Sequence, residues 1–287
     1  MSPSEHRREM ARTIAAAHQR LGVPGLMAVV SGSVADAAAD DLSDIDMALT
    51  WPELPAPEHL RAACASVGAA PWHWQAGTWD AGEVVVAFRH QGIEVQIAYS
   101  SAACMERDLA EVLEQHNPDT PLHKLAEGLL KAQPLEGAGL LQALQQRVAA
   151  FPAPLARAMA THFLGRVTPW RAVPQLLQRD TLPWCRELQV QLCWRLLGAL
   201  AGLNQRYFTT FQFKRLQAFA DSLAVAPPAL AQRMDQALSA DSATAFALLH
   251  ALEAEVLQLV ARHWPEMDLR EVRQRHQAFQ PLAAPAG

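Results

Sequence analysis

Apolar residues recur with two different periods along the first hundred residues, so this region is predicted to contain both helices and strands. Residues 6–21 (HRREMARTIAAAHQRL) have the composition of a helix, which ends before Gly22 and Pro24. The short apolar run LMAVVS at 26–31 is typical of a buried strand. After it we expect a turn at Gly32-Ser33, a short alanine-rich helix at 34–41, a strand at 45–49 and a helix at 56–68.

Two further apolar runs predict a hairpin. EVVVAFR at 83–89 and GIEVQIAY at 92–99 are separated only by His90-Gln91. A short connection of this kind favours a tight turn, here at Gly92. The first hundred residues are therefore expected to form a mixed α/β domain.

The pattern changes near Ala102 to stretches rich in Leu, Ala, Gln and Arg, punctuated by prolines and without strand-like alternation. Helices are predicted at 102–115, 121–131, 138–150, 153–164, 184–203, 211–223, 227–238, 243–262 and 268–278. The prediction is an α+β chain, with a catalytic mixed sheet over residues 1–117 and an all-α helical bundle over residues 118–287. We expect the tail at 281–287 to be frayed.

Composition is consistent with folded domains and no secretion. The chain has 287 residues, of which 51% are hydrophobic, and a net charge of −5. The four cysteines lack metal or redox spacing, so buried free thiols are expected, and no apolar leader or membrane span is visible. We expect a cytoplasmic protein with no membrane partner.

Charge is distributed unevenly along the chain. Residues 1–120 carry 17 acidic and 7 basic residues, whereas residues 121–287 carry 12 acidic and 17 basic residues. The absence of a strongly basic balance disfavours a long nucleic-acid partner.

The candidate chemistry begins with Asp44-Ile45-Asp46. Residues two apart in a strand point to the same side, so both carboxylates would share one face while Ile45 and Met47 pack inward. Paired carboxylates are hard oxygen ligands of the kind that magnesium prefers, and two magnesium ions can align a phosphoryl transfer. Asp44 and Asp46 are therefore predicted metal ligands and catalytic residues.

Gly32 and Ser33 precede this pair at the end of the apolar run. A glycine after a strand lets the backbone approach a phosphate closely, and Ser33 can add a hydroxyl donor. Ser43, next to Asp44, is included with them as a candidate nucleotide contact.

The segment VVSGSVADAAADDLSDIDMAL resembles the signature of the DNA polymerase β nucleotidyltransferase superfamily: a hydrophobic strand, Gly-Ser, then Asp-hydrophobic-Asp. The segments at 145–159 and 203–216 also resemble the helical region of bacterial members that act on small molecules, including antibiotics. The resemblance implies a mixed sheet backed by helices, Asp44 and Asp46 as metal ligands, and ATP or another nucleoside triphosphate as co-substrate.

Such enzymes usually carry a third carboxylate on a later strand, and this chain departs from that pattern. In Gly92-Ile93-Glu94-Val95-Gln96-Ile97, the position expected to be aspartate is Gln96, whereas Glu94 lies two residues earlier on the same strand face. We predict that Glu94 is the third catalytic carboxylate and metal ligand. The alternative is that the position is vacant.

Lysine is a compact phosphate partner, and the three lysines, Lys124, Lys131 and Lys214, all fall in the predicted helical domain. Lys214 and Lys124 are the candidate triphosphate contacts. Trp51, Trp72, Trp74 and Trp79 lie around the predicted strands, where one of them is placed to stack on a base or flat acceptor, unless all pack in the core.

Together these residues predict a magnesium-dependent nucleotidyltransferase that transfers AMP from ATP to a hydroxyl of a small molecule and releases pyrophosphate. Two alternatives stay open: a catalytically weakened nucleotide-binding or regulatory protein of the antitoxin type, and an enzyme that transfers AMP to proteins. The sequence alone leaves the acceptor, the preferred triphosphate and the oligomeric state undetermined.

Overall fold

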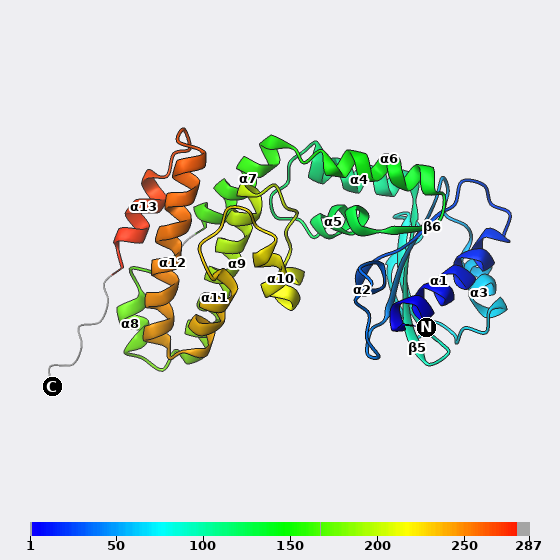
Figure 1. The fold of residues 1–287 in the computed structure, drawn as a ribbon, viewed down its shortest axis with the longest axis horizontal. Helices are drawn as coiled ribbons and strands as arrows, with labels where there is room; N and C mark the ends of the chain where they lie inside the picture. Colours follow the sequence, from blue (N-terminus) through cyan, green and yellow to red (C-terminus); the bar gives the residue numbers. More distant parts are fainter. Residues whose placement is uncertain (1, 167, 280–287) are drawn as a thin grey trace. The chain divides into compact units, whose positions relative to one another are not determined.

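The computed structural model describes residues 2–166 and 168–279 (Figure 1), so the expectation for the tail at 281–287 lies outside the described residues. The chain divides into two compact units. Unit 1 comprises residues 1–115 and 125–150, and unit 2 comprises residues 116–124 and 151–287. The fold is α+β, with a mixed sheet in unit 1 and helices in unit 2.

Unit 1 is built on a six-stranded sheet of order β3-β4-β5-β2-β1-β6. β2 and β5 are parallel, and the other neighbouring strands are antiparallel. The strands are β1 (Met27–Val30), β2 (Ile45–Trp51), β3 (Trp74–Thr78), β4 (Glu83–His90), β5 (Ile93–Ser101) and β6 (Gln133–Glu136). The hairpin expected between β4 and β5 is confirmed, because Gln91 and Gly92 both have positive φ, 49° and 81°, as a tight primed turn requires.

One face of the sheet forms the core of unit 1. Alternate residues such as Met47 of β2, Val86 of β4 and Ile97 of β5 are buried there with Ile14 and Leu60. Ile14 and Leu60 belong to two helices that lie side by side in Figure 1. The helices of unit 1 are α1 (Pro3–Gln19), α2 (Gly32–Ala35), α3 (Pro57–Ser66), α4 (Ala102–Leu113) and α6 (Ala138–Ala149), with most of α5 (His123–Lys131).

Two strands of this sheet are absent from the sequence prediction. β6 is a short edge strand that contains Pro134, and β3 at the other edge has every residue exposed. Neither sequence alternates between apolar and polar residues, which is the pattern that predicts a strand. Both can still form edge strands, because an edge strand tolerates proline and does not need a buried face. Since β6 pairs with β1, residues 125–150 group with the sheet, whereas the sequence places them after a boundary at 117–118.

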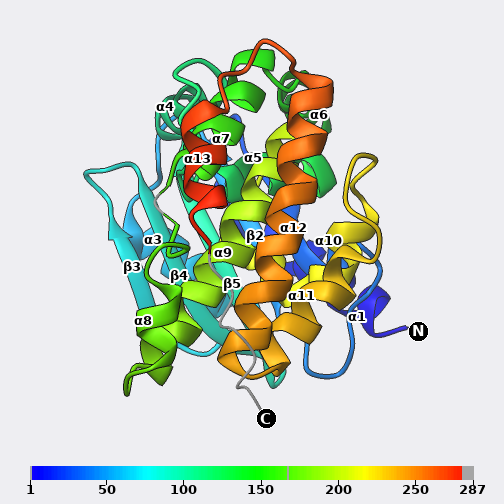
Figure 2. The same ribbon diagram turned by 90° about the vertical axis from the view of Figure 1, so that its left-hand side faces the viewer.

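Unit 2 is helical in the part that the structure describes. Figure 2 shows α9, α11 and α12 running alongside one another, and these three helices contact one another pairwise. The helices are α7 (Ala153–Gly165), α8 (Val173–Leu177), α9 (Leu182–Leu203), the 3₁₀ helix η1 (Thr210–Arg215), α10 (Leu216–Asp221), α11 (Leu230–Ser239), α12 (Ser242–His263) and α13 (Arg270–Gln277).

α12 is long and apolar enough to cross a membrane by length and composition alone. Its fully buried Glu253 instead accepts hydrogen bonds from Trp170 Nε1 at 2.5 Å and His276 Nδ1 at 2.7 Å. Arg195, whose pKa burial lowers to about 10, lies 3.8 Å from the same carboxylate. α12 is therefore the core helix of unit 2.

Candidate functional site

Asp46 lies in the middle of the sheet with its side chain opposite the core. Its neighbours Ile45 and Met47 are buried, whereas Asp46 is only partly buried, which confirms the predicted alternation. The main-chain N–H of Ser31, just after β1, donates to the Asp46 carbonyl at 2.9 Å. This bond holds the end of β1 beside the carboxylate.

Gly32 begins α2 with a φ of +63°, a conformation that favours glycine. A Cβ at this position would lie only 2.6 Å from Asp46 Oδ2. The glycine therefore satisfies two requirements at once: a left-handed backbone and close approach to a carboxylate. The structure thus brings the Gly-Ser motif and Asp46 of the Asp-x-Asp motif together.

The helix after Gly32 is shorter than predicted. α2 ends at Ala35, and Ala37 adopts a φ of +55°. Residues 36–41 are therefore not helical, although their alanine content predicted a helix. Ser33, also expected to contact phosphate, is half-buried on this single turn. The segment that follows returns the chain to Asp44.

Ser43 belongs to a turn immediately before Asp44. Its hydroxyl donates to Asp40 Oδ1 at 2.8 Å and accepts the Asp40 N–H at 3.0 Å. The first of these bonds is the main cause that lowers the pKa of Asp40. The structure therefore shows Ser43 shaping the turn, and its predicted contact with nucleotide remains a prediction.

Arg7 is a positioning residue that the sequence analysis missed. Its guanidinium is 4% exposed and donates to the carbonyls of Ser43 at 2.8 Å and Asp41 at 3.2 Å. Buried arginine normally needs a carboxylate or several carbonyls to satisfy its donors. Arg7 thus fixes the loop that leads into Asp44, and nothing in the helical composition of 6–21 indicated this role.

Asp44 stands immediately before β2, and its nearest recorded partner is Gln96. Gln96 Nε2 lies 3.5 Å from Asp44 Oδ2, and Gln96 is also the residue registered with Asp46 across the parallel pair. The neutral amide of Gln96 therefore occupies the place beside both aspartates where the superfamily pattern expects a carboxylate.

Glu94 is held by other residues. Its carboxylate accepts from His73 Nε2 at 3.1 Å and lies 3.8 Å from Arg89 Nε. Among the described residues, Glu94 does not join Asp44 and Asp46 in a group whose ligand atoms all lie within 4.8 Å of one another. Its predicted role as a metal ligand is left as a proposal.

The described residues contain one group that meets this distance criterion: Glu83, Cys104 and Asp108. Burial raises the pKa of the Cys104 thiol and of Glu83. Arg107 Nη2 contacts both Cys104 Sγ, at 2.9 Å, and Asp108 Oδ1, at 3.1 Å. A guanidinium therefore already supplies positive charge here. All four cysteines are free and buried, as expected.

The two predicted phosphate-binding lysines come together in unit 2. Lys124 Nζ lies 4.1 Å and Lys214 Nζ 5.2 Å from the centre of the Phe211 ring. The ring is 48% exposed and is carried by η1, whose start is capped by Thr209. Two ammonium groups beside one exposed aromatic ring form a small cationic surface.

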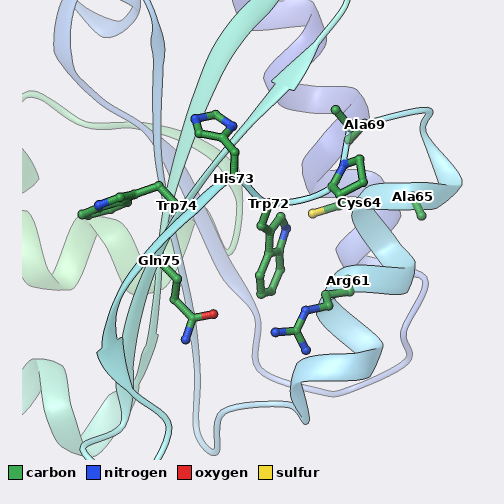
Figure 3. Close-up of a pocket in the computed structure, with 10 residues that line it drawn as sticks. Arg61, Cys64, Ala65, Ala69, Trp72, His73, Trp74 and Gln75 are labelled. Carbon is green, nitrogen blue, oxygen red and sulfur yellow. The ribbon is translucent and has the colours of Figure 1, made fainter.

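The tryptophans predicted to lie near the strands have different environments. Trp51 is 1% exposed, and Trp72 packs 6.0 Å from Tyr99, so these two are packing residues. Trp74 is 49% exposed at the start of β3. Trp72 and Trp74 both border a pocket of about 520 Å³ in unit 1 (Figure 3), whose lining also includes Arg61, Cys64, His73 and Gln75.

The chain matches no protein-family model and has no significant match among curated proteins. Among solved structures it has counterparts at low similarity.

One counterpart is a nucleotidyltransferase-like protein from Exiguobacterium sibiricum 255-15. It has 14% sequence identity and a TM-score of 0.41, and the match covers 93% of this chain and 80% of that one. The apo form I of a CCA-adding enzyme has 14% identity and a TM-score of 0.29 over 94% of this chain and 69% of the enzyme. A CCA-adding enzyme in complex with CTP has 12% identity and a TM-score of 0.29, and the match covers 100% of this chain and 80% of the enzyme. At these identities and TM-scores the matches carry no conclusion about the fold, family or activity of this chain.

Proposed function

We propose that this protein is a magnesium-dependent nucleotidyltransferase. It would transfer a nucleoside monophosphate, AMP from ATP, to the hydroxyl of a small molecule and release pyrophosphate. The observation that carries the proposal is the close approach of Gly32 to Asp46, which puts the backbone proposed to bind phosphate beside a carboxylate. A purely structural sheet would not require that combination.

The donor set at Asp44 and Asp46 suits magnesium. Both are carboxylates, and magnesium takes hard oxygen ligands while completing its coordination with water and substrate phosphates. When bound, the metal would neutralise phosphate charge and polarise the α-phosphoryl group. Gln96 beside Asp44 can donate a hydrogen bond to the same carboxylate, which fixes its orientation.

The reaction has a simple balance of bonds. The acceptor oxygen forms a bond to the α-phosphorus, the bond from that phosphorus to the bridging oxygen of pyrophosphate breaks, and the acceptor hydroxyl loses its proton. Glu94 is the proposed proton acceptor, with His73 at 3.1 Å orienting its carboxylate. Gly32 and Ser33 would hold the triphosphate, and Ser43, Lys124 and Lys214 are its further proposed contacts.

The test uses ATP labelled in the α-phosphate, magnesium and a panel of hydroxylated small molecules. We expect label to move to a small molecule with the wild-type protein, and Asp44→Asn and Asp46→Asn to lower the rate by at least about 100-fold. Asp80→Asn, which removes an exposed carboxylate from the same unit, is the matched control. Wild-type behaviour of Asp46→Asn would exclude the proposed chemistry.

The arrangement of Gln96 and Glu94 supports a second candidate, a nucleotide-binding or regulatory protein of the antitoxin type with weakened catalysis. Glu94→Gln separates the two. If Glu94 takes the proton, the variant should still bind ATP but turn over about 100-fold more slowly. Magnesium-dependent ATP binding with no turnover by the wild-type protein would favour the regulatory candidate. Label found in protein or in RNA would instead identify a macromolecular acceptor.

A further inference from the structure

A single row of residues crosses four strands of the sheet and ends at an exposed tryptophan. Trp74 is registered with Ala87, Ala87 with Gln96, and Gln96 with Asp46. Residues directly opposite each other on neighbouring strands project from the same face of a sheet. Trp74 therefore shares a face with Asp46, the face opposite the core.

Trp74 differs from the other tryptophans near the sheet. In Figure 3 its indole points away from Trp72 and Arg61, which lie together on the α3 side, where the Arg61 guanidinium is 4.7 Å from the Trp72 ring centre. Half of Trp74 is exposed, and the residue between it and Gln96 in the row is the small Ala87. No bulky side chain of the row separates the indole from Gln96.

The in-line geometry of phosphoryl transfer indicates from which side of Asp46 the acceptor enters. Gly32 approaches Asp46 from the β1 side, so the proposed triphosphate contact lies on that side. In phosphoryl transfer the attacking and leaving oxygens lie roughly in line on opposite sides of the phosphorus. The acceptor must then enter from the other side, over β5, β4 and β3. Three strand spacings separate the backbones of Asp46 and Trp74, roughly 14 Å, the span of a drug-sized molecule.

One carboxylate on this side, that of Glu94, is already paired. Glu94 is paired with Arg89 at 3.8 Å and with His73 at 3.1 Å. An acceptor recognised by charge alone would meet a carboxylate that already has partners. The exposed indole offers the stronger contact, because an aromatic ring stacks on flat or apolar surfaces.

We propose that Trp74 forms an acceptor subsite, which selects hydroxylated small molecules that carry a flat ring about 10 Å from the reacting hydroxyl, a distance set by strand spacing and side-chain reach. The subsite rests on the proposed nucleotidyl transfer, because the acceptor side is defined by the in-line geometry at Asp46. It further specifies the substrate class, since it favours ring-bearing acceptors over plain polyols and polycations.

The test compares two probes with identical sugar hydroxyls, phenyl β-glucoside and methyl β-glucoside. Binding is measured by saturation-transfer NMR in the presence of magnesium and a non-hydrolysable ATP analogue, so it does not depend on turnover. The wild-type protein should bind the phenyl compound about tenfold more tightly, a factor typical of one aromatic stacking contact. Trp74→Ala should abolish that preference, and Trp74→Phe should retain most of it.

Trp184→Ala is the matched control, since Trp184 is 62% exposed and lies in unit 2. The proposal is overturned if Trp74→Ala keeps the phenyl preference, if the wild-type protein shows none, or if Trp74→Ala weakens nucleotide-analogue binding instead, which would place a base on the indole. Failure of the nucleotidyl-transfer proposal would be seen in a different measurement. In that case Asp46→Asn would bind the ATP analogue with the same magnesium dependence as the wild-type protein.

Discussion

Gly32 and Asp46 lie so close that a methyl group on the glycine would stand 2.6 Å from the aspartate Oδ2. The two residues are 14 positions apart in the sequence and belong to different elements. Their contact joins the start of α2 to the start of β2, and it makes Gly32 a sensitive probe of the site.

Gly32→Ala should therefore lower activity by more than its loss of stability accounts for. The left-handed φ of +63° costs an alanine about 1 kcal/mol of unfolding free energy, and the methyl group additionally displaces the Asp46 carboxylate. Gly68→Ala is a close control, because Gly68 has a φ of +74° with nothing within 4 Å of the added Cβ. Thermal melts should show similar losses for both variants, whereas only Gly32→Ala should lose magnesium-dependent ATP binding. Equal ATP binding by both would contradict the role of Gly32.

Gln96→Asp should increase the affinity for magnesium. The substitution places a third carboxylate beside Asp46 in the register, and a hard anionic oxygen attracts a divalent cation. We expect the magnesium concentration that gives half-maximal ATP binding to fall several-fold. Gln75→Asp adds the same charge on the opposite face, since Gln75 is registered with the buried Val86, and should leave the magnesium titration unchanged. A titration that is identical for Gln96→Asp and wild type would place the metal elsewhere.

Lys124→Ala and Lys214→Ala should each raise the KM for ATP about tenfold, the size of a lost charge-assisted hydrogen bond. Both ammonium groups lie beside Phe211, so they form one cationic surface. The double variant should therefore lose no more free energy of ATP binding than the two single variants together. Lys131 is the remaining lysine and is paired with Glu127 at 3.0 Å. Lys131→Ala, the control, should leave the KM for ATP near the wild-type value. Steady-state kinetics measures these KM values, and an equal increase in all three variants would indicate a general charge effect instead.

Acidification should destabilise unit 1 through His18. Burial lowers the pKa of His18 below its ordinary value of 6.5, although its hydrogen bond to the Ile14 carbonyl partly opposes the shift. Below pH 6.5 the unfolded chain therefore binds more protons than the folded chain, and the free energy of unfolding falls as the pH drops toward the folded pKa. The Tm should decrease more between about pH 7.5 and pH 5.5 for wild type than for His18→Gln. His59→Gln, on the exposed side of α3, should follow wild type, and equal slopes for all three would refute the assignment.

A fragment of residues 1–117 should aggregate, whereas residues 1–150 should remain folded. The shorter fragment lacks β6, so β1 would expose an unpaired edge. Light scattering and circular dichroism of the two fragments would test this expectation. A folded, monomeric 1–117 fragment would show that β6 is dispensable.

Much of the fold follows from local pattern. The hairpin at Gly92 was predictable because positive φ is favoured by few residue types, and the helices of the second half were predictable from composition and proline spacing. β6 was not predictable, because QPLE has neither alternation nor a strong β preference, and its place depends on pairing with a strand about a hundred residues away. Long-range pairing of this kind leaves little trace in a local window.

The candidate site was predicted in part. The outward position of Asp46 between buried Ile45 and Met47 follows from the period of a strand, whereas the approach of Gly32 to Asp46 is seen only in the structure. The partners of Glu94 did not follow, because His73 lies 21 residues away on another element. Arg7 was missed for the same reason: its carbonyl acceptors, more than 30 residues away, are defined only once the loop at 41–43 has folded.

The division of the chain into two units also bears on how such a protein can be inherited. The polypeptide passes from one unit to the other after residues 115, 124 and 150. A single recombination between genes at any of these three points would therefore separate β6 from β1, residues 116–124 from the rest of unit 2, or both. Neither unit can be exchanged whole by one crossover at a unit boundary.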